Sequence, residues 1–548
     1  MASSTPPPDA GGPEYLDQSG GEPVGPSSSG SGGGRRTALV AGGAVAGLVL
    51  VGGGVWAAMS FFASGPQPAE ALPASTIGYA SVDLDPSGGQ KIEAFRMIQK
   101  FPALEKELDG LDADDDLLGK AFEDIEKECD LSYEDDVKPW LGYRFAAAAV
   151  DLGDEMPTPV GVLQVTDADA AEDGLAALQK CTGSDMGGWV IEGDWAVVAE
   201  TEEIAQQVTD ATADGTLADD ETYQDWTDEV GDAGVMSMYA APEAGKFFAE
   251  LAGTFAGGGM VPGLSQPMPM DPAAAEVEPP AVPEELLKSL EEFQGAAATL
   301  RFDDGALEFE VAGAAGTEDQ MQMFATDRGD DVLTTLPEDT AAAVGFGFAE
   351  GWVSQMIEQM ANMSGGEMTV EDMEAELEAA TGLTLADLET LAGESAALSV
   401  SSDVNLETFV NSEDGSDVPI GAKVQGDASG IQDVLTKLAK TLGEEGSVVL
   451  GNDAEGDMVA IGPNPDYRGQ LLEDGNLGDS DVFQNVVREA DEANSIFYVN
   501  FDAGDWLTSL AEGDQEIADN LVPFQGFGFS SWNDDGSSHA VFRITTND

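Results

Sequence analysis

The stretch "GYASVDLDPSGGQKIEAF", residues 78–95, contains the unit from which the fold is built. In its first half, Tyr79, Ser81 and Asp83 alternate with Ala80, Val82 and Leu84, as in a half-buried strand. The residues "DPSGG" then end the strand. A helical pattern follows, in which we expect Ile92, Phe95 and Ile98 to face a sheet. The same strand, turn and helix recur in "YAAPEAGKFFAEL", "FGFAEGWVSQMI" and "YVNFDAGDWLTSL", so the turn is predicted to be architectural.

Asp83, Asp85 and Ser87 in this stretch are spaced like the first ligands of a calcium loop. Such a loop ends on a bidentate glutamate at position twelve, which is Ala94 when counted from Asp83. A phosphate site is disfavoured because the two aspartates would repel the anion and no GxxxxGK[ST] motif is present. We therefore predict neither a cofactor nor a metal site. Asp83, Asp85 and Ser87 are kept only as weak candidates for metal ligands.

Four segments of the C-terminal bulk occur twice in the same order. The matching pairs are 71–84 with 335–348, 129–150 with 381–400, 217–251 with 477–510, and 293–313 with 524–544. We interpret them as two tandem homologous repeats, 72–313 and 336–548, joined by a connector at 314–335. Hairpin and helix signals alternate in each, which predicts an α+β fold with a largely antiparallel sheet and packed helices in each repeat. A Pro-, Gly- and Met-rich insertion at about 256–284 is expected to be a flexible loop.

An uncharged apolar stretch, residues 37–63, precedes the repeats. As a helix rising ~1.5 Å per residue it would span about 40 Å, more than the ~30 Å hydrocarbon core of a bilayer. Arg35 and Arg36 come directly before it, and the next basic residue is Lys91. Because basic residues stay on the cytoplasmic side, we expect a single-pass helix in the cell membrane, with the N-terminus in the cytoplasm and the C-terminal bulk outside.

The flanking segments complete the predicted organisation. Residues 1–36 are rich in Pro, Gly and Ser and are predicted to be a disordered cytoplasmic tail, and residues 64–71 a linker. The lipid bilayer is thus a predicted partner, through residues 37–63. Gly43 and Gly47 form a GxxxG spacing that permits self-association, although glycine is scattered through the whole apolar stretch.

The chain is strongly acidic. Its 548 residues include 105 acidic and 21 basic ones, for a formal net charge of −84. Such a charge repels DNA, RNA and anionic lipid head groups, so we exclude nucleic acid as a partner. A solvated acidic shell on a secreted or salt-adapted protein explains the composition, and a dedicated cation-binding surface is the alternative.

Cysteine and histidine are scarce. Cys129 and Cys181 are the only cysteines, and both follow the predicted membrane stretch, where disulfides persist, so we predict a bond between them. The single histidine, His539, is expected to be an exposed residue of the last hairpin. Neither a GxSxG nor an HExxH motif is present, which disfavours histidine-dependent catalysis.

Two motifs resemble a known family. "LPASTIGYASVDLDPSGGQKIEAF" at 72–95 and "YEDDVKPWLG" at 133–142 are similar to the membrane-anchored actinobacterial proteins grouped as the domain of unknown function 3352 family. The similarity covers the anchor and the whole external region. It implies the anchored topology, and because the family has no assigned activity, it supplies no catalytic residues.

The expected function is therefore that of a non-enzymatic, extracytoplasmic module that binds a ligand or an envelope protein, with its site at the seam between the repeats. Two alternatives stay open. A carrier of a lipid or other apolar ligand requires an apolar cavity. A carboxylate-dependent hydrolase of the cell envelope requires two Asp or Glu side chains about 5–10 Å apart in a cleft.

Overall fold

The computed structural model describes residues 66–547 apart from 85–88, 108–117, 120–121, 123–128, 130, 155, 183–186, 233, 248, 250–283, 315–327, 364–368, 405–411, 413–414, 505, 510, 512–513 and 535. The predicted tail and membrane helix, with Arg35, Arg36, Gly43 and Gly47, lie outside the described residues, as does nearly all of the predicted insertion. Within the described part, no helix combines the length and apolar character needed to cross a membrane.

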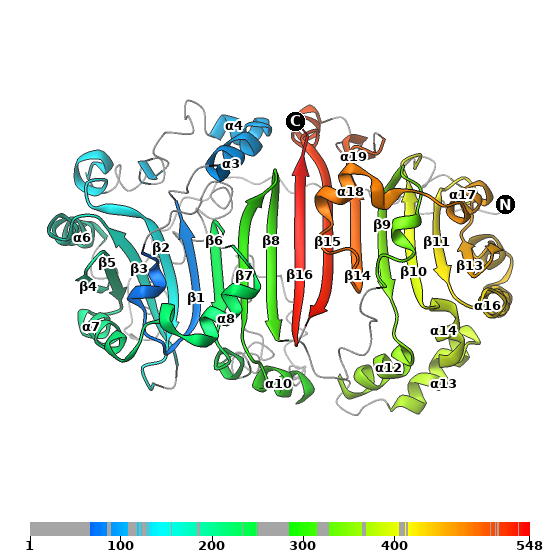
Figure 1. The fold of residues 1–548 in the computed structure, drawn as a ribbon, viewed down its shortest axis with the longest axis horizontal. Coiled ribbons are helices and arrows are strands. Elements are labelled where there is room, and N and C mark those ends of the chain that lie inside the picture. Colours follow the sequence, from blue (N-terminus) through cyan, green and yellow to red (C-terminus); the bar gives the residue numbers. More distant parts are fainter. Residues whose placement is uncertain are drawn as a thin grey trace, which may run out of the picture.

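One antiparallel sheet of 16 strands runs through the described chain (Figure 1). Its strands are β1 (Thr76–Asp83), β2 (Leu141–Val150), β3 (Thr158–Val165), β4 (Gly188–Glu192), β5 (Trp195–Ala199), β6 (Met236–Ala240), β7 (Ala296–Asp303), β8 (Ala306–Ala314), β9 (Thr340–Gly347), β10 (Ser395–Ser401), β11 (Ile420–Gln425), β12 (Asn452–Glu455), β13 (Met458–Ile461), β14 (Ser495–Asn500), β15 (Phe524–Asp534) and β16 (Ser537–Thr546). The prediction of an α+β fold with a large antiparallel sheet is confirmed.

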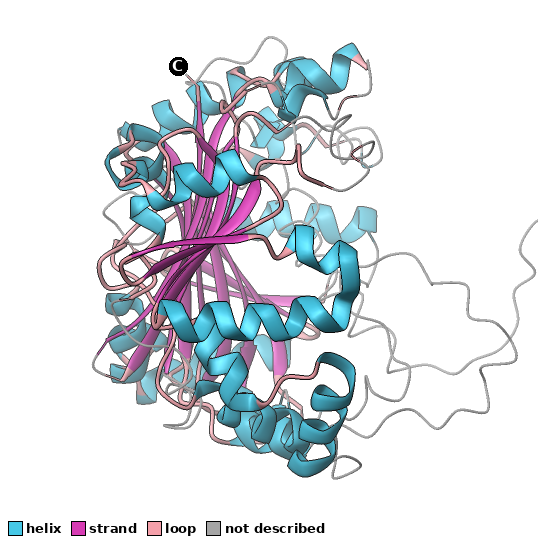
Figure 2. Ribbon diagram, turned by 90° about the vertical axis from the view of Figure 1, so that its right-hand side faces the viewer, coloured by secondary structure: helices cyan, strands magenta, loops and turns pink. Residues whose placement is uncertain are grey.

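The helices join these strands and pack on both sides of the sheet (Figure 2). They are α3 (Gly89–Gln99), α4 (Pro102–Glu107), α6 (Ala168–Thr182), α7 (Glu202–Ala211), α8 (Glu221–Glu229), α10 (Glu284–Glu291), α12 (Trp352–Met363), α13 (Val370–Thr381), α14 (Leu385–Ala392), α16 (Ala428–Val449), α17 (Pro465–Leu472), α18 (Asp481–Val486), α19 (Trp506–Ser509) and α20 (Gln515–Leu521). Shorter turns of 3-10 helix lie between them, including η1 (Pro68–Ala71) and η7 (Leu333–Thr335).

The strand order is the same on the two sides of the central β8–β16 pair. From the centre outward it runs β8, β7, β6, β1, β2, β3, β5, β4 on one side and β16, β15, β14, β9, β10, β11, β13, β12 on the other. β8 and β16 pair from Ala306 opposite Thr545 to Ala314 opposite Ser537. The two halves therefore form one continuous sheet, and the seam at which we expected a ligand groove is a pair of hydrogen-bonded strands.

The two faces of the sheet differ in what packs on them. Residues directly opposite each other in antiparallel strands point to the same face, so each face can be followed across the sheet by register. We call the face that carries Tyr79, Glu308 and Arg543 the covered face. Helices α7, α8, α17 and α18 contribute to the two largest core clusters, which lie on this face. We call the opposite face the open face.

Close packing on the covered face depends on glycine in β15. A Cβ atom at Gly528 would lie 2.1 Å from the backbone oxygen of Val486 in α18. A Cβ at Gly526 would lie 2.7 Å from the Val482 side chain. Gly526 and Gly528, in the stretch "GFGF" at 526–529, thus leave room for α18, while Phe527 and Phe529 point to the open face.

The ends of the open face are covered by helices from both halves. Helix α6 covers Phe145 and Leu163 at one end, and α14 and α16 pack around Val424 at the other. Helix α3 buries Phe302 near the β7–β8 turn through Ala94 and Met97. The middle of the open face lies between these helices.

Helix α3 differs in its rotation from the prediction. Ile92, expected to face the sheet, is 48% exposed, and this prediction is wrong. Ile98 is buried as predicted, and Ala94 and Met97 are buried beside it. These positions form an i, i+3, i+4 stripe, and contact of that stripe with Phe302 sets the rotation of the helix.

The described parts of the predicted linker and connector belong to the folded unit. Pro68 and Ala69 of η1 are buried, and Ala69 and Leu72 join the first core cluster. Leu333 of η7 is fully buried in the second cluster. The chain is thus tied into the sheet from its first described residues.

Asp387 should make the packing of α14 on α16 sensitive to acid. Lys437 of α16 donates a 2.7 Å hydrogen bond to it, and this bond, together with the one from the Thr384 backbone, lowers the pKa of Asp387 to about 2. Because this pKa lies below the ordinary value of 3.8, the stabilisation is complete above about pH 4 and is lost as the pH falls toward 2. We expect Asp387→Ala to cost about 1 kcal/mol at pH 7 and less at pH 2, measured by urea unfolding.

Asp372 provides the matched control for that prediction. It occupies the same position in the capping box of α13, where its pKa is lowered by the hydrogen bonds from Thr369, and none of the described lysines is bonded to it. Asp372→Ala should have a smaller effect than Asp387→Ala. Equal effects would mean that Lys437 contributes nothing.

Candidate functional site

Of the three predicted metal candidates, the structure describes Asp83. Asp83 is buried, and Arg144 donates from Nε to its Oδ2 atom at 2.8 Å. Asp85 and Ser87 lie outside the described residues. Among the residues that the structure does describe, no group of three His, Cys, Asp or Glu side chains is arranged to hold a metal ion. The charge of Asp83 is thus engaged by an arginine.

Asp83 should therefore matter for stability. Arg144 is 4% exposed, so removing its carboxylate partner leaves a charge in the protein interior. We expect Asp83→Ala to lower the free energy of unfolding by about 3 kcal/mol, measured by chemical denaturation. Glu134→Ala breaks the exposed pair of Glu134 with Lys138 and should change it by less than about 0.5 kcal/mol. A loss no greater than that of Glu134→Ala would contradict the buried-pair account.

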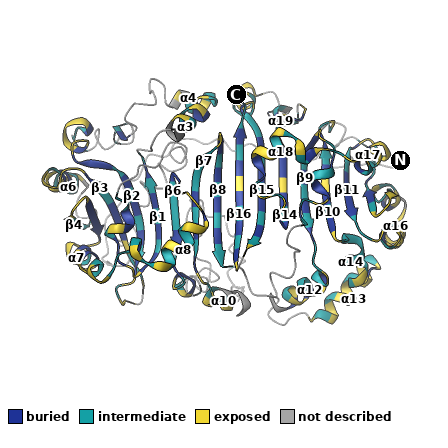
Figure 3. Ribbon diagram, viewed as in Figure 1, coloured by how far each residue is buried: buried dark blue, intermediate teal, exposed yellow. Residues whose placement is uncertain are grey.

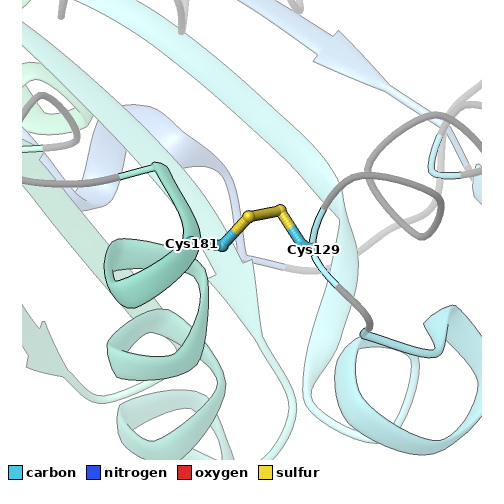
Figure 4. The surroundings of a disulfide bond; sticks show 2 residues. All are labelled: Cys129 and Cys181. Carbon is cyan, nitrogen blue, oxygen red and sulfur yellow. A yellow bond between two sulfur atoms is a disulfide. The ribbon is translucent and has the colours of Figure 1, made fainter.

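The structure joins Cys129 and Cys181 by a disulfide (Figure 4). Their Cα atoms are 5.3 Å apart, and 52 positions separate them in the sequence. Cys181 lies near the end of α6, so the bond ties the segment before the Tyr133–Val137 turn to that helix. The bond restrains the helix that covers one end of the open face.

His539 is buried, so the prediction of an exposed hairpin residue is wrong. It is 8% exposed, and its ring stacks on Trp532 at 5.1 Å. The strand register places His539 on the covered face, where α8 brings Glu229 to 3.2 Å from its Nε2 atom. Burial therefore follows from contact between the two halves.

The surroundings of His539 do not form a catalytic triad. Ser537 Oγ and Glu229 Oε2 both contact the same ring nitrogen, Nε2. In a triad, the nucleophile and the orienting carboxylate contact different nitrogens of the ring. The other nitrogen, Nδ1, is buried and has no hydrogen-bond partner among the described residues. The geometry favours a structural role for the cluster.

A second cluster of charges lies at the seam on the covered face, and we call it the seam ion cluster. It consists of three arginines and three acids: Arg301, Arg488, Arg543, Asp303, Glu308 and Glu310. Glu308 accepts from Arg301 Nε at 2.7 Å and from Arg488 Nε at 3.3 Å, and it also accepts from Arg543. The acids belong to the first half, and two of the arginines belong to the second.

The seam ion cluster resembles a carboxylate pair only superficially. Burial alone would raise the pKa of Asp303, but the hydrogen bond from Arg543 and the charge of Arg488 outweigh it and lower that pKa. Burial raises the pKa of Glu310 despite its contact with Arg301. Glu308 is 1% exposed, so a substrate does not reach it. The cluster joins the two halves and does not supply the accessible acid and base that a hydrolase needs.

The middle of the open face carries a continuous line of apolar side chains, which we call the central row. Its members are paired from strand to strand by register: Leu398, Val344, Phe497, Phe529, Phe542, Phe309, Leu300, Met236, Val82 and Phe145. At ~4.8 Å between neighbouring strands, the nine steps of the row span about 43 Å. The row crosses the seam at the pairing of Phe542 with Phe309.

The central row is partly open to solvent. Leu398 is 56% exposed, Phe497 39% and Phe542 38%, and exposed positions are visible along β14 and β16 in Figure 3. Of the ten members, only Phe145 packs against one of the core clusters of the described chain. The exposed members of the row thus lie in the second half, and the members contributed by the first half are half-buried.

Charge is distributed between the two faces in an unusual way. The covered face carries the buried ionic side chains of the strands: Asp83, Arg144, Glu308, Glu310, Lys423 and Arg543. No charged residue belongs to the central row or to the parallel row beside it. The parallel row consists of Ala396, Phe346, Ser495, Ser531, Ala540, Val311, Ala298, Met238, Ala80 and Ala147. In a chain of net charge −84, the open face is the surface that excludes charge.

Sequence reasoning missed this surface, although one signal for it exists. β2 reads "LGYRFAAAAV" and β6 reads "MSMYA", so apolar residues occupy both faces of these strands. In an antiparallel sheet with one solvated face, alternation with polar residues is the rule. Strands that lack this alternation indicate a second apolar face, but not whether helices cover it.

The comparisons with known proteins assign the chain to a family. The family described as "Protein of unknown function (DUF3352)" matches residues 178–539 of the 548-residue chain. The matched region begins inside α6 and ends in β16, whereas the motifs at 72–95 and 133–142 precede it. No curated protein and no solved structure matches the chain. With most of its length inside the match, the chain belongs to the DUF3352 family of proteins of unknown function.

Proposed function

We propose that the protein is a membrane-anchored, extracytoplasmic binding protein without enzymatic activity, and that it binds an apolar ligand on the open face. The observation that carries this proposal is the central row, an uncharged and partly exposed apolar line in a chain of net charge −84. Apolar surface of this extent on a soluble domain is typical of a binding site. Ligand contact would remove Leu398, Phe497 and Phe542 from water.

The carrier alternative gains support over the hydrolase alternative. The structure offers an apolar surface built by ten strands, while the acids at the seam are neutralised by arginine and Glu308 is buried. A carrier that uses an open sheet face does not need the enclosed cavity that we expected from the sequence. The acidic surface elsewhere keeps such a protein soluble and apart from nucleic acid.

We also infer that the two halves are tandem homologous repeats. Four sequence segments recur in the same order, and the strand order of β1–β8 is repeated by β9–β16 on the other side of the β8–β16 pair. Joining two copies through their edge strands doubles the length of the apolar face. On this account, duplication made a surface longer than either copy provides.

A reporter dye at the end of the central row tests the binding proposal. Both native cysteines are in the disulfide, so Leu398→Cys introduces the sole free thiol for a polarity-sensitive fluorophore. Met156→Cys places the same dye at a 66% exposed position in the β2–β3 turn, away from the row. The probe ligand is a neutral long-chain alcohol added to the full chain.

We expect the alcohol to shift the Leu398→Cys dye to shorter wavelength and to leave the Met156→Cys dye unchanged. The shift should saturate, because a site holds a limited number of ligands. Equal responses at the two positions, or a response that never saturates, would overturn the proposal.

A further inference from the structure

The proposed function leaves the ligand class open, and the shape of the surface narrows it. We propose that the ligand is the hydrocarbon chain of an uncharged or zwitterionic lipid, taken from the bilayer in which the protein is anchored. This inference rests on the proposed function. It adds the source of the ligand and the direction in which its chain lies, across the strands and over the seam.

The apolar strip is long and narrow. Its length of about 43 Å follows from the strand spacing, whereas its width is limited. On one side, the otherwise apolar neighbouring row is interrupted in β14 and β15 by Ser495 and Ser531, whose hydroxyls lie 2.6 Å apart. On the other side, α3 covers Phe302 and contacts Leu307. A strip only a few side chains wide suits an extended chain better than a broad protein surface.

Aromatic rings line the strip at its middle. Phe529 and Phe542 have ring centroids 4.7 Å apart, and Phe542 and Phe309 follow at 6.2 Å across the seam. Phe497 contacts Phe527 at 5.9 Å in an edge-on arrangement. These rings form a continuous apolar surface without a hydrogen-bonding group, so they can recognise methylene groups but cannot orient a polar ligand.

The two ends of the strip are not alike. Phe145 packs against the cluster under α6, which closes that end. Leu398 is 56% exposed at the other end. A lipid whose head group stays in solvent past Leu398 would therefore lay its chain from that exposed end along the strip toward the seam, and Phe145 closes the far end.

The position of the fold relative to the expected anchor points to the bilayer as the source. The apolar stretch ends at residue 63, and the Pro66 carbonyl already accepts a hydrogen bond from Arg144 Nη1 in β2. Three residue steps of at most ~3.8 Å allow about 11 Å between them. The sheet is thus held near the outer surface of the membrane, where lipid chains are the abundant apolar ligand.

The net charge restricts the head group. A surface of −84 repels anionic lipids near the protein, and this repulsion acts within a screening length of about 8 Å at physiological salt. Lipids with an uncharged or zwitterionic head group escape this cost. Selection among lipids would then come from the protein's charge, since the central row itself holds no charged group.

A photoreactive lipid tests this inference. The full chain is reconstituted into phosphatidylcholine vesicles that contain a phosphatidylcholine with a photoreactive group at the end of one acyl chain. After illumination, adducts are mapped on peptides. We expect adducts at the central row, on the segments that carry Phe309, Phe497 and Phe542, in addition to any within residues 37–63. When a third of the phosphatidylcholine is replaced by phosphatidylglycerol with the same photoreactive chain, we expect fewer adducts per photoreactive molecule from the anionic lipid than from phosphatidylcholine.

Variants identify the site. Phe309→Asp combined with Phe542→Asp should reduce the central-row adducts at least tenfold, while Met156→Asp should leave them unchanged. If the double variant fails to fold, Leu398→Asp, at a position 56% exposed, is expected to reduce them on its own. Adducts confined to residues 37–63 would overturn the lipid assignment. In that case a saturating dye response to the alcohol would leave the proposed function standing, and loss of both signals would overturn both.

Discussion

Replacing Glu308 by alanine is expected to lower the free energy of unfolding by about 3–5 kcal/mol. Glu308 is 1% exposed and accepts hydrogen bonds from Arg301, Arg488 and Arg543. Its removal leaves three arginines facing two carboxylates. One of these arginines, Arg543, is only 2% exposed. An uncompensated charge in the interior costs far more than the ion pair itself contributes. Urea unfolding of the full chain, followed by tryptophan fluorescence, measures the change.

The exposed pair between Arg328 and Glu394 is the control for that substitution. Its side chains are 42% and 65% exposed, so Glu394→Ala should change the free energy of unfolding by at most about 1 kcal/mol. Two of the arginines that contact Glu308 lie in the second half. In Glu308→Ala, both halves should therefore unfold together at a lower urea concentration than in the unsubstituted protein. If Glu308→Ala costs no more than Glu394→Ala, the seam ion cluster does not hold the two halves.

Phe542→Asp should weaken binding of the alcohol at least tenfold while costing less stability than the core substitution Phe302→Ala. Phe542 sits at the middle of the central row and is 38% exposed, and it belongs to none of the core clusters of the described residues. A carboxylate there remains in contact with water in the free protein but would be desolvated beneath a hydrocarbon chain. The affinity is read from the dye at Leu398→Cys.

Phe302 separates the effect of the ligand surface from that of the core. It lies on the same face, but α3 covers it and it is 1% exposed. Phe302→Ala should therefore cost about 3–5 kcal/mol of stability, with binding by the remaining folded protein retained. A large stability loss for Phe542→Asp, comparable with that of Phe302→Ala, would show that the middle of the open face is core and not a binding surface.

Local patterns allowed much of the architecture to be predicted. The strand and the helix predicted within 78–95 correspond to β1 and α3, and the repeated order of sequence segments agrees with the repeated strand order. These features depend on short-range signals such as alternation and glycine turns. The helix rotation that buries Ala94 and exposes Ile92 was missed, because it depends on contact with Phe302, two hundred positions away in the chain.

The joining of the two halves was also beyond the sequence. β8 and β16 read as ordinary strands, and nothing in them indicates that each is the other's partner. Pairing of these strands brings α8 over His539, which explains the burial of a residue that local pattern placed at the surface. Which apolar face stays open likewise depends on where helices from distant segments pack.

The most direct test of the binding account is the dissociation constant of the neutral long-chain alcohol for the full chain, read from the Leu398→Cys dye. It is measured with and without the substitutions Phe309→Asp and Phe542→Asp, and with Met156→Asp as the control. The account predicts saturable binding that is lost in the double variant and unchanged in the control. Binding of the same strength in all three proteins would contradict the assignment of the open face as the ligand site.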